Sequence, residues 1–155
     1  MGAVTPLVRP GAVLFACNFN RVRSPMAETL LRRLARDRIY ADSCGLRLAA
    51  SADASPVDPF AESVMAELAC DLSGHAPKTF DDLHDSSFDL VVSFTPEAQH
   101  RAVEMTRGRA AEIEYWPIFD PTLVEGSRES RLAAYREVRD GLATRIADRF
   151  GPLVR

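Results

Sequence analysis

Two kinds of segment alternate along the chain, and this alternation restricts the folds that it can adopt. Residues 12–16 are a short, continuous apolar run, typical of a strand buried on both faces of a sheet. From Pro25 onward the apolar residues recur every three to four positions, which indicates an amphipathic helix. Ser24 is predicted to cap that helix, because a serine followed by a proline is a common start signal.

The same alternation continues to the end of the sequence. Further strands are predicted at 39–43, 88–94 and 113–118, further helices at 59–68, 96–105 and 128–149, and a loop with a short helix at 71–84. Strands that alternate with helices imply right-handed crossovers and a parallel sheet covered on both faces. We therefore expect an α/β fold in three layers, α/β/α, around a four-stranded parallel sheet.

The size and composition indicate one soluble domain. A chain of 155 residues without repeats or linkers predicts a single domain over 1–155, with its core at 12–150. No apolar run approaches the roughly 18 residues of a membrane span, and no signal peptide is recognisable, so we expect a cytoplasmic protein without membrane binding. The net charge of −3 argues against nucleic-acid binding. The three cysteines lack zinc-ligand spacing, so free thiols, no metal and no cofactor are expected.

The loop after the first predicted strand is the candidate functional site, because ligands of parallel sheets bind at the carboxyl ends of strands. In it, Cys17 is followed by five residues and then by Arg23 and Ser24. Backbone N–H groups of such a loop can surround a tetrahedral anion at a helix N-terminus. The helix and Arg23 would favour the thiolate of Cys17, and Ser24 could donate a hydrogen bond to the sulfur. The alternative is that Cys17 is a small buried apolar residue at a strand end.

Four segments in order resemble one known family. The segment from Cys17 to Glu28, with its Cys-x5-Arg-Ser-Pro-Met-Ala-Glu pattern, resembles the phosphate-binding loop and first helix of the low-molecular-weight protein tyrosine phosphatases. Residues 42–45, residues 71–75 and the pair Asp120-Pro121 resemble further motifs of that family. The resemblance covers about residues 12–150 and implies a phosphotyrosine protein phosphatase I-like fold.

The resemblance also implies a role for each motif residue. Cys17 would attack phosphorus and form a phosphocysteine, Arg23 would hold the phosphoryl group, and Asp120 would protonate the leaving oxygen and then activate water. Six loop residues would bind the substrate: Asn18, Phe19, Asn20, Arg21, Val22 and Ser24. Ser43 and His75 would support the loop by hydrogen bonds. The implied activity is metal-independent phosphomonoester hydrolysis, most specifically of protein phosphotyrosine, with a phosphorylated protein or small aryl phosphate as the substrate.

This sequence departs from the family at four positions near the implied site. Phe19, Arg21 and Val22 stand where members have a glycine, an aliphatic residue or threonine, and often a second cysteine. Arg21, if it points inward, would repel the guanidinium of phosphoarginine. Thr122 stands where tyrosine-directed members have an aromatic residue, and Trp116 is expected in the core.

Two other functions stay open at this stage. A thiol-dependent arsenate reductase would share the fold and loop, but its two further cysteines follow the third strand, and residues 93–103 contain none. A non-catalytic anion-binding or interaction protein would keep the loop without useful turnover.

Overall fold

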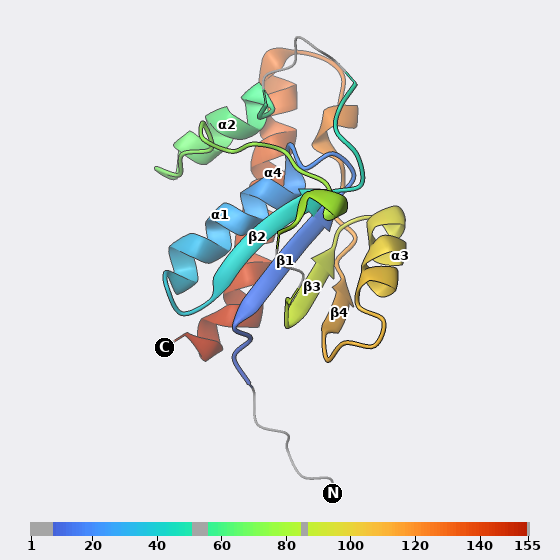
Figure 1. Ribbon diagram of the computed structural model, residues 1–155. Coiled ribbons are helices and arrows are strands. Elements are labelled where there is room, and N and C mark those ends of the chain that lie inside the picture. The colour runs from blue at the N-terminus through green and yellow to red at the C-terminus, as the bar shows by residue number, and fades with distance from the viewer. Residues whose placement is uncertain (1–7, 51–55, 85–86, 155) are drawn as a thin grey trace, which may run out of the picture.

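A parallel sheet of four strands forms the centre of the structure, a computed structural model that describes residues 8–50, 56–84 and 87–154 (Figure 1). The strand order is β2-β1-β3-β4, and every neighbouring pair is parallel. The strands are β1 (Ala12–Cys17), β2 (Tyr40–Gly45), β3 (Leu90–Ser93) and β4 (Glu112–Tyr115). The predicted four-stranded parallel sheet is confirmed.

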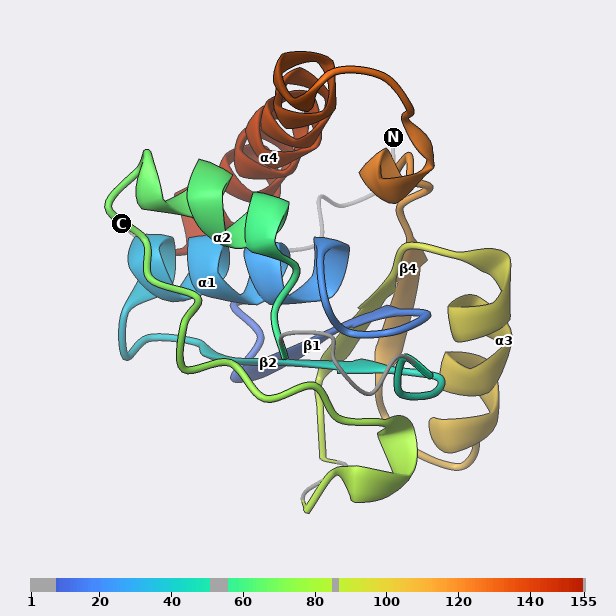
Figure 2. The same cartoon turned by 90° about the horizontal axis from the view of Figure 1, so that it is seen from above.

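Helices cover both faces of this sheet and complete the three predicted layers (Figure 2). One face packs against α1 (Arg23–Ala35), α2 (Pro59–Ala66) and α4 (Arg128–Phe150). The other face packs against α3 (Pro96–Met105) and the short 3-10 helix η1 (Phe80–Asp82). Two more 3-10 turns, η2 (Pro121–Leu123) and η3 (Gly151–Leu153), flank α4.

Alternation along β1 decides which face each side chain joins, because successive side chains of a strand point to opposite faces. Phe15 and Cys17 belong to the core on the α1 and α4 face. Leu14 and Ala16 belong to the smaller core on the α3 face, together with Cys44 of β2. The last residue of β1 therefore points toward the N-terminus of α1.

Several predicted boundaries differ from the observed ones by one to three residues, and two of these differences have a clear local cause. β4 ends at Tyr115 instead of residue 118, because Pro117 has no N–H to donate to a sheet. Trp116 lies in the core, 2% exposed and close to the ring of Phe15. α1 begins at Arg23 rather than after Ser24, so Ser24 is inside the first turn and does not cap the helix. Among the described residues, no helix is both long and apolar enough to cross a membrane.

Candidate functional site

A tight loop joins the end of β1 to the start of α1 and carries the predicted motif. Cys17 ends the strand and Arg23 begins the helix, so the five residues between them form the loop itself. Cys17 lies at the base of the loop and is only 3% exposed. The loop thus presents a sulfur, a guanidinium and a helix N-terminus to the same space, as the spacing predicts.

Two hydrogen-bonding groups contact the sulfur of Cys17. Ser24 Oγ lies 2.9 Å from Cys17 Sγ, and the backbone N–H of Asn20 donates to the same sulfur at 3.3 Å. Asn20 Nδ2 donates to Ser24 Oγ at 2.9 Å, which leaves the hydroxyl proton of Ser24 available to the sulfur. This bond explains why Ser24 does not cap α1, since its oxygen is used inside the loop.

Asn20 is the centre of the network that holds the loop. Its φ angle of 57° lies in the left-handed region, which asparagine tolerates better than most residues. Its side chain donates to Ser43 Oγ at 2.9 Å, and its carbonyl oxygen lies 2.8 Å from His75 Nε2. Ser43 and His75, which were predicted to support the loop by hydrogen bonds, both contact Asn20.

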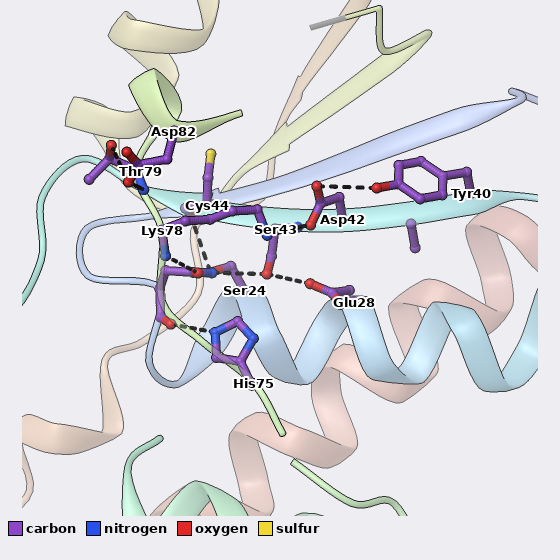
Figure 3. A network of polar contacts seen from close by, with 12 residues as sticks. Ser24, Glu28, Tyr40, Asp42, Ser43, Cys44, His75, Lys78, Thr79 and Asp82 are labelled. Atoms are coloured by element: carbon purple, nitrogen blue, oxygen red, sulfur yellow. Dashed lines mark hydrogen bonds and ion pairs between the residues drawn. The ribbon is translucent and has the colours of Figure 1, made fainter. Parts of the chain in front are cut away.

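The network continues to two residues that the sequence analysis did not identify (Figure 3). Ser43 Oγ donates to Glu28 Oε1 at 2.5 Å, and the buried Glu28 carboxylate pairs with Arg32 at 2.8 Å. Lys78 donates its backbone N–H to Asn20 Oδ1 at 3.0 Å, while its Nζ pairs with Asp42 at 2.6 Å. Glu28 lies inside the motif and could have been identified from it. Lys78 contacts Asn20 through its backbone N–H, which almost any residue type could supply, so the sequence does not reveal this contact.

β2 approaches the loop so closely that a glycine is required at its end. A Cβ atom on Gly45 would lie 2.9 Å from the Asn18 carbonyl oxygen and from the Asn20 nitrogen. Two N–H groups of the chain after β2, those of Leu46 and Arg47, donate to the same Asn18 carbonyl at 2.8 and 3.1 Å. The loop therefore rests directly on the backbone that follows β2.

Arg23 and Asp120 stand side by side above this loop. Arg23, 9% exposed, donates from Nη1 to the Ile118 carbonyl at 2.9 Å, and its Nη2 lies 3.8 Å from Asp120 Oδ2. Asp120 precedes η2, where its Oδ1 accepts from the N–H and the hydroxyl of Thr122 at 3.0 and 2.7 Å. One carboxylate oxygen is thus held by the turn, and the other faces Arg23.

These residues line a pocket of about 280 Å³, which we call the thiol pocket. Its walls are Cys17, Phe19, Arg21, Val22, Arg23, Ala49, Asp58, Asp120 and Thr122. Phe19, Arg21 and Val22, three of the residues predicted to bind the substrate, therefore line this pocket. Asn20 and Ser24 do not line the pocket, because their fully buried side chains are used in the network beneath the loop. The side chain of Asn18 also turns elsewhere, since its Oδ1 accepts from the Thr95 hydroxyl at 2.8 Å.

Asp58 is a buried residue in the wall of the thiol pocket, and the sequence motifs assign it no role. It caps α2, where its Oδ1 accepts from the N–H groups of Phe60 and Ala61 at 2.9 and 3.2 Å. Its Oδ2 accepts from the hydroxyl of Tyr135 at 3.0 Å. Burial and this carboxylate raise the pKa of Tyr135. Both oxygens of Asp58 are therefore committed to structure.

The other two cysteines lie away from the thiol pocket. Cys44 is buried on the α3 face of the sheet, opposite to Cys17, and burial raises the pKa of its thiol. Cys70 lies after α2, and its Sγ accepts a hydrogen bond at 3.6 Å from Nη1 of Arg33, a residue in the last turn of α1. Within the part of the chain that the structure describes, no group of three or more His, Cys, Asp or Glu side chains could hold a metal ion.

Comparison with known proteins identifies the family. Residues 12–150 match the sequence profile of the low molecular weight phosphotyrosine protein phosphatases. This match covers most of the chain, including β1, the loop, Asp120 and all of α4. The chain therefore belongs to the low-molecular-weight phosphotyrosine protein phosphatase family.

Its curated relatives bear the names of arsenate reductases. An arsenate reductase of Halalkalibacterium halodurans is 30% identical over 134 residues, which cover 86% of this chain and 91% of that protein. A glutaredoxin arsenate reductase of Synechocystis sp. is 33% identical over 134 residues, 86% of this chain and 92% of that one.

Solved structures agree with the fold. A mutant of YwlE from Bacillus subtilis superposes with a TM-score of 0.73 at 22% identity, covering 93% of this chain and 99% of its own. The tyrosine phosphatase AmsI of Erwinia amylovora gives a TM-score of 0.72 at 19% identity, over 94% of this chain and 93% of its own. At these identities the likeness concerns the fold alone.

Proposed function

We propose that this protein hydrolyses phosphomonoesters through a phosphocysteine, without a metal, and that its substrate class is phosphotyrosine in proteins. One observation carries the proposal. The sulfur of Cys17 lies at the base of a pocket whose walls hold both a guanidinium, Arg23, and a carboxylate, Asp120. A nucleophile, an anion clamp and a proton donor are the three groups that this chemistry needs.

The reaction divides into two displacements at phosphorus. The Cys17 thiolate attacks, a sulfur–phosphorus bond forms, and the bond from phosphorus to the ester oxygen breaks as Asp120 donates its proton to that oxygen. Water then attacks the phosphocysteine, gives a proton to Asp120, and releases phosphate and the thiolate. Arg23 and the loop N–H groups bind the phosphoryl oxygens in both steps, since the planar fork of arginine suits two oxygens at once.

The pocket wall favours an aryl ester over a phosphorylated guanidinium. Arg21 lines the thiol pocket, so a substrate whose leaving group is positively charged would be repelled there. Phe19, 41% exposed at the same wall, offers a ring face to a phenyl leaving group and compensates for Thr122, which has no ring. We therefore expect phosphotyrosine peptides to be hydrolysed faster than phosphoarginine peptides of the same sequence.

The decisive test is hydrolysis of p-nitrophenyl phosphate by the purified protein in excess EDTA. The unchanged protein should turn over, Cys17→Ser should not, and Cys70→Ser should match the unchanged protein, because Cys70 lies away from the pocket. If the unchanged protein were no more active than Cys17→Ser, the proposal would be rejected, and a non-catalytic anion-binding protein would be the better hypothesis.

Arsenate reduction is the second candidate, and the names of the curated relatives favour it. Arsenate has the shape and charge of phosphate and would form the same kind of adduct on Cys17. Its reduction to arsenite takes two electrons, which come from thiols as a disulfide forms at the cysteine sulfur. Residues 93–103 contain no cysteine and Cys44 is on the opposite face of the sheet, so the second thiol would have to be external.

Arsenite formation separates the two candidates. Arsenate would be supplied with glutathione and glutaredoxin, or with thioredoxin and its reductase, and oxidation of NADPH would be followed. Turnover with an external thiol, lost in Cys17→Ser, would support a reductase. We expect no arsenate-dependent oxidation of NADPH above background, and we expect hydrolysis of the aryl phosphate.

A further inference from the structure

A second hollow lies directly beside the thiol pocket, and nothing in the proposed reaction uses it. It has a volume of about 410 Å³ and shares Arg23 and Asp120 with the thiol pocket. We call it the accessory hollow. A substrate whose phosphoryl group lies above Cys17 could reach it past Asp120, because the two cavities adjoin at that side chain.

Two exposed aromatic rings form the apolar part of the accessory hollow. Tyr115, at the end of β4, is 41% exposed, and Phe119, directly before Asp120, is 59% exposed. Side chains of this size expose much apolar area to water, and grouped exposure of this kind is typical of binding surfaces. Two partly exposed aromatic side chains therefore line one side of the candidate site.

The charged residue that distinguishes the hollow is Glu97, in the first turn of α3. Its carboxylate makes no ion pair or hydrogen bond with any other described residue. The positive end of α3 would attract an anion, but a full negative charge in the first turn exceeds the half charge of a helix terminus. Arg23 is already committed to the Ile118 carbonyl and Asp120, and in the reaction to the phosphoryl group. The hollow is thus suited to a cation.

We propose that the accessory hollow binds the guanidinium of an arginine that neighbours the phosphotyrosine in a peptide substrate. This inference rests on the proposed function and adds a sequence preference to it. A guanidinium is planar, lies favourably over aromatic rings, and can donate two hydrogen bonds to one carboxylate. Phe119 and Tyr115 supply the rings, and Glu97 supplies the carboxylate.

A part of the thiol pocket that does not belong to the accessory hollow carries positive charge, which gives the proposal a direction. There Arg21 lines the wall, and the guanidinium of Arg47 lies 5.1 Å from the centre of the Phe19 ring. An arginine of the substrate would be repelled on that side. The preference should therefore occur on one flank of the phosphotyrosine and not on both.

The test uses a neutral phosphotyrosine peptide in which one arginine is moved through the three positions on either flank. Citrulline at the same position is the control, because it keeps the shape of arginine without its charge. On one flank, arginine should raise kcat/KM over citrulline by roughly 3- to 10-fold, the range that a cation–π contact and an exposed ion pair together give. The ratio should fall toward parity in Glu97→Gln and persist in Glu104→Gln, on the same helix but outside the hollow.

The ratio of kcat/KM between the arginine and citrulline peptides does not depend on how much active protein a variant yields. Three results would each overturn the inference. The first is equal kcat/KM for the arginine and citrulline peptides at every position. The second is a higher kcat/KM for a peptide with norleucine, an apolar residue, at that position than for either of them, and the third is an unchanged arginine-to-citrulline ratio in Glu97→Gln. The same ratio is also measured as Kd with Cys17→Ser, which needs no turnover. If p-nitrophenyl phosphate is not hydrolysed while this Kd ratio persists, the proposed function fails and the binding site stands.

Discussion

At the scale of single residues, the two carboxylates in the wall of the thiol pocket differ in what surrounds them. Asp58 accepts from two N–H groups of α2 and from Tyr135, so neither of its oxygens is available. Asp120 has one oxygen bound by Thr122, while the other lies 3.8 Å from Arg23, beside the space above Cys17. This difference supports our proposal that Asp120 transfers the proton.

Replacement of Asp120 by Asn should therefore affect substrates in proportion to their need for a proton. Phenyl phosphate, with a poor leaving group, should slow by about 10²- to 10⁴-fold, and p-nitrophenyl phosphate by much less. Arg23→Lys should slow both, because a single ammonium cannot hold two phosphoryl oxygens as the guanidinium does. Glu125→Gln, in the nearby loop, is the control. Equal slowing of both substrates by Asp120→Asn would place the acid elsewhere.

At the scale of elements, the loop depends on the close approach of β2. Gly45→Ala places a methyl group 2.9 Å from three backbone atoms of the loop, and backbone cannot yield as a flexible side chain does. We expect a loss of about 1–3 kcal/mol in stability and weaker inhibition by vanadate. Gly141→Ala, in α4 with open space around it, should instead stabilise by about 0.5–1 kcal/mol and leave vanadate binding unchanged. Urea denaturation and vanadate titration measure both effects.

Helices α2 and α4 are joined by an ion pair whose contribution depends on pH. Hydrogen bonds from Arg136 and Arg139 lower the pKa of Glu67 from 4.5 to about 2. A carboxyl whose pKa is lowered by folding stabilises the fold above its unfolded pKa and loses this effect as the pH falls through the folded value. The urea midpoint of Glu67→Gln should therefore be lower than that of the unchanged protein at pH 7, and the gap should narrow below about pH 4.5. Glu137→Gln, exposed on α4, should show no such dependence.

The sequence predicts elements better than it predicts their ends. Apolar runs and helical spacing locate all four strands and the main helices, because burial on a sheet or a helix face leaves that pattern. The start of α1 is wrong since Ser24 has two possible uses, and only the fold decides that its oxygen serves Cys17 and Asn20. Lys78 was not predicted at all, because its backbone N–H and carbonyl make the contacts.

At the scale of the whole molecule, the three thiols are isolated from one another. Cys17 and Cys44 lie on opposite faces of the sheet, and about 14 Å of helix separates Ser24, beside Cys17, from Arg33, beside Cys70. Disulfides require neighbouring Cβ atoms that point toward each other. No thiol is therefore in place to protect Cys17 by forming a disulfide within the chain.

Peroxide should accordingly inactivate the protein in a way that dithiothreitol does not reverse. A sulfenic acid on Cys17 that finds no partner thiol is oxidised further to the sulfinic acid. Mass spectrometry of the Cys17 peptide should show two added oxygen atoms. The Cys44→Ser, Cys70→Ser double variant should behave identically, and bound phosphate should slow the loss. A disulfide-linked Cys17 peptide, with activity restored by thiol, would refute the isolation of the three thiols.

Lys78 has a practical consequence for anyone who handles this protein. It is the one lysine among 155 residues, and its Nζ is paired with Asp42 in the segment that holds the loop between β1 and α1. Apart from the terminal α-amine, amine-reactive dyes, biotin esters and activated resins would find only Lys78, and modification of Lys78 would disturb the support of the loop. Surface attachment and fluorescence assays of this chain should therefore use an engineered tag.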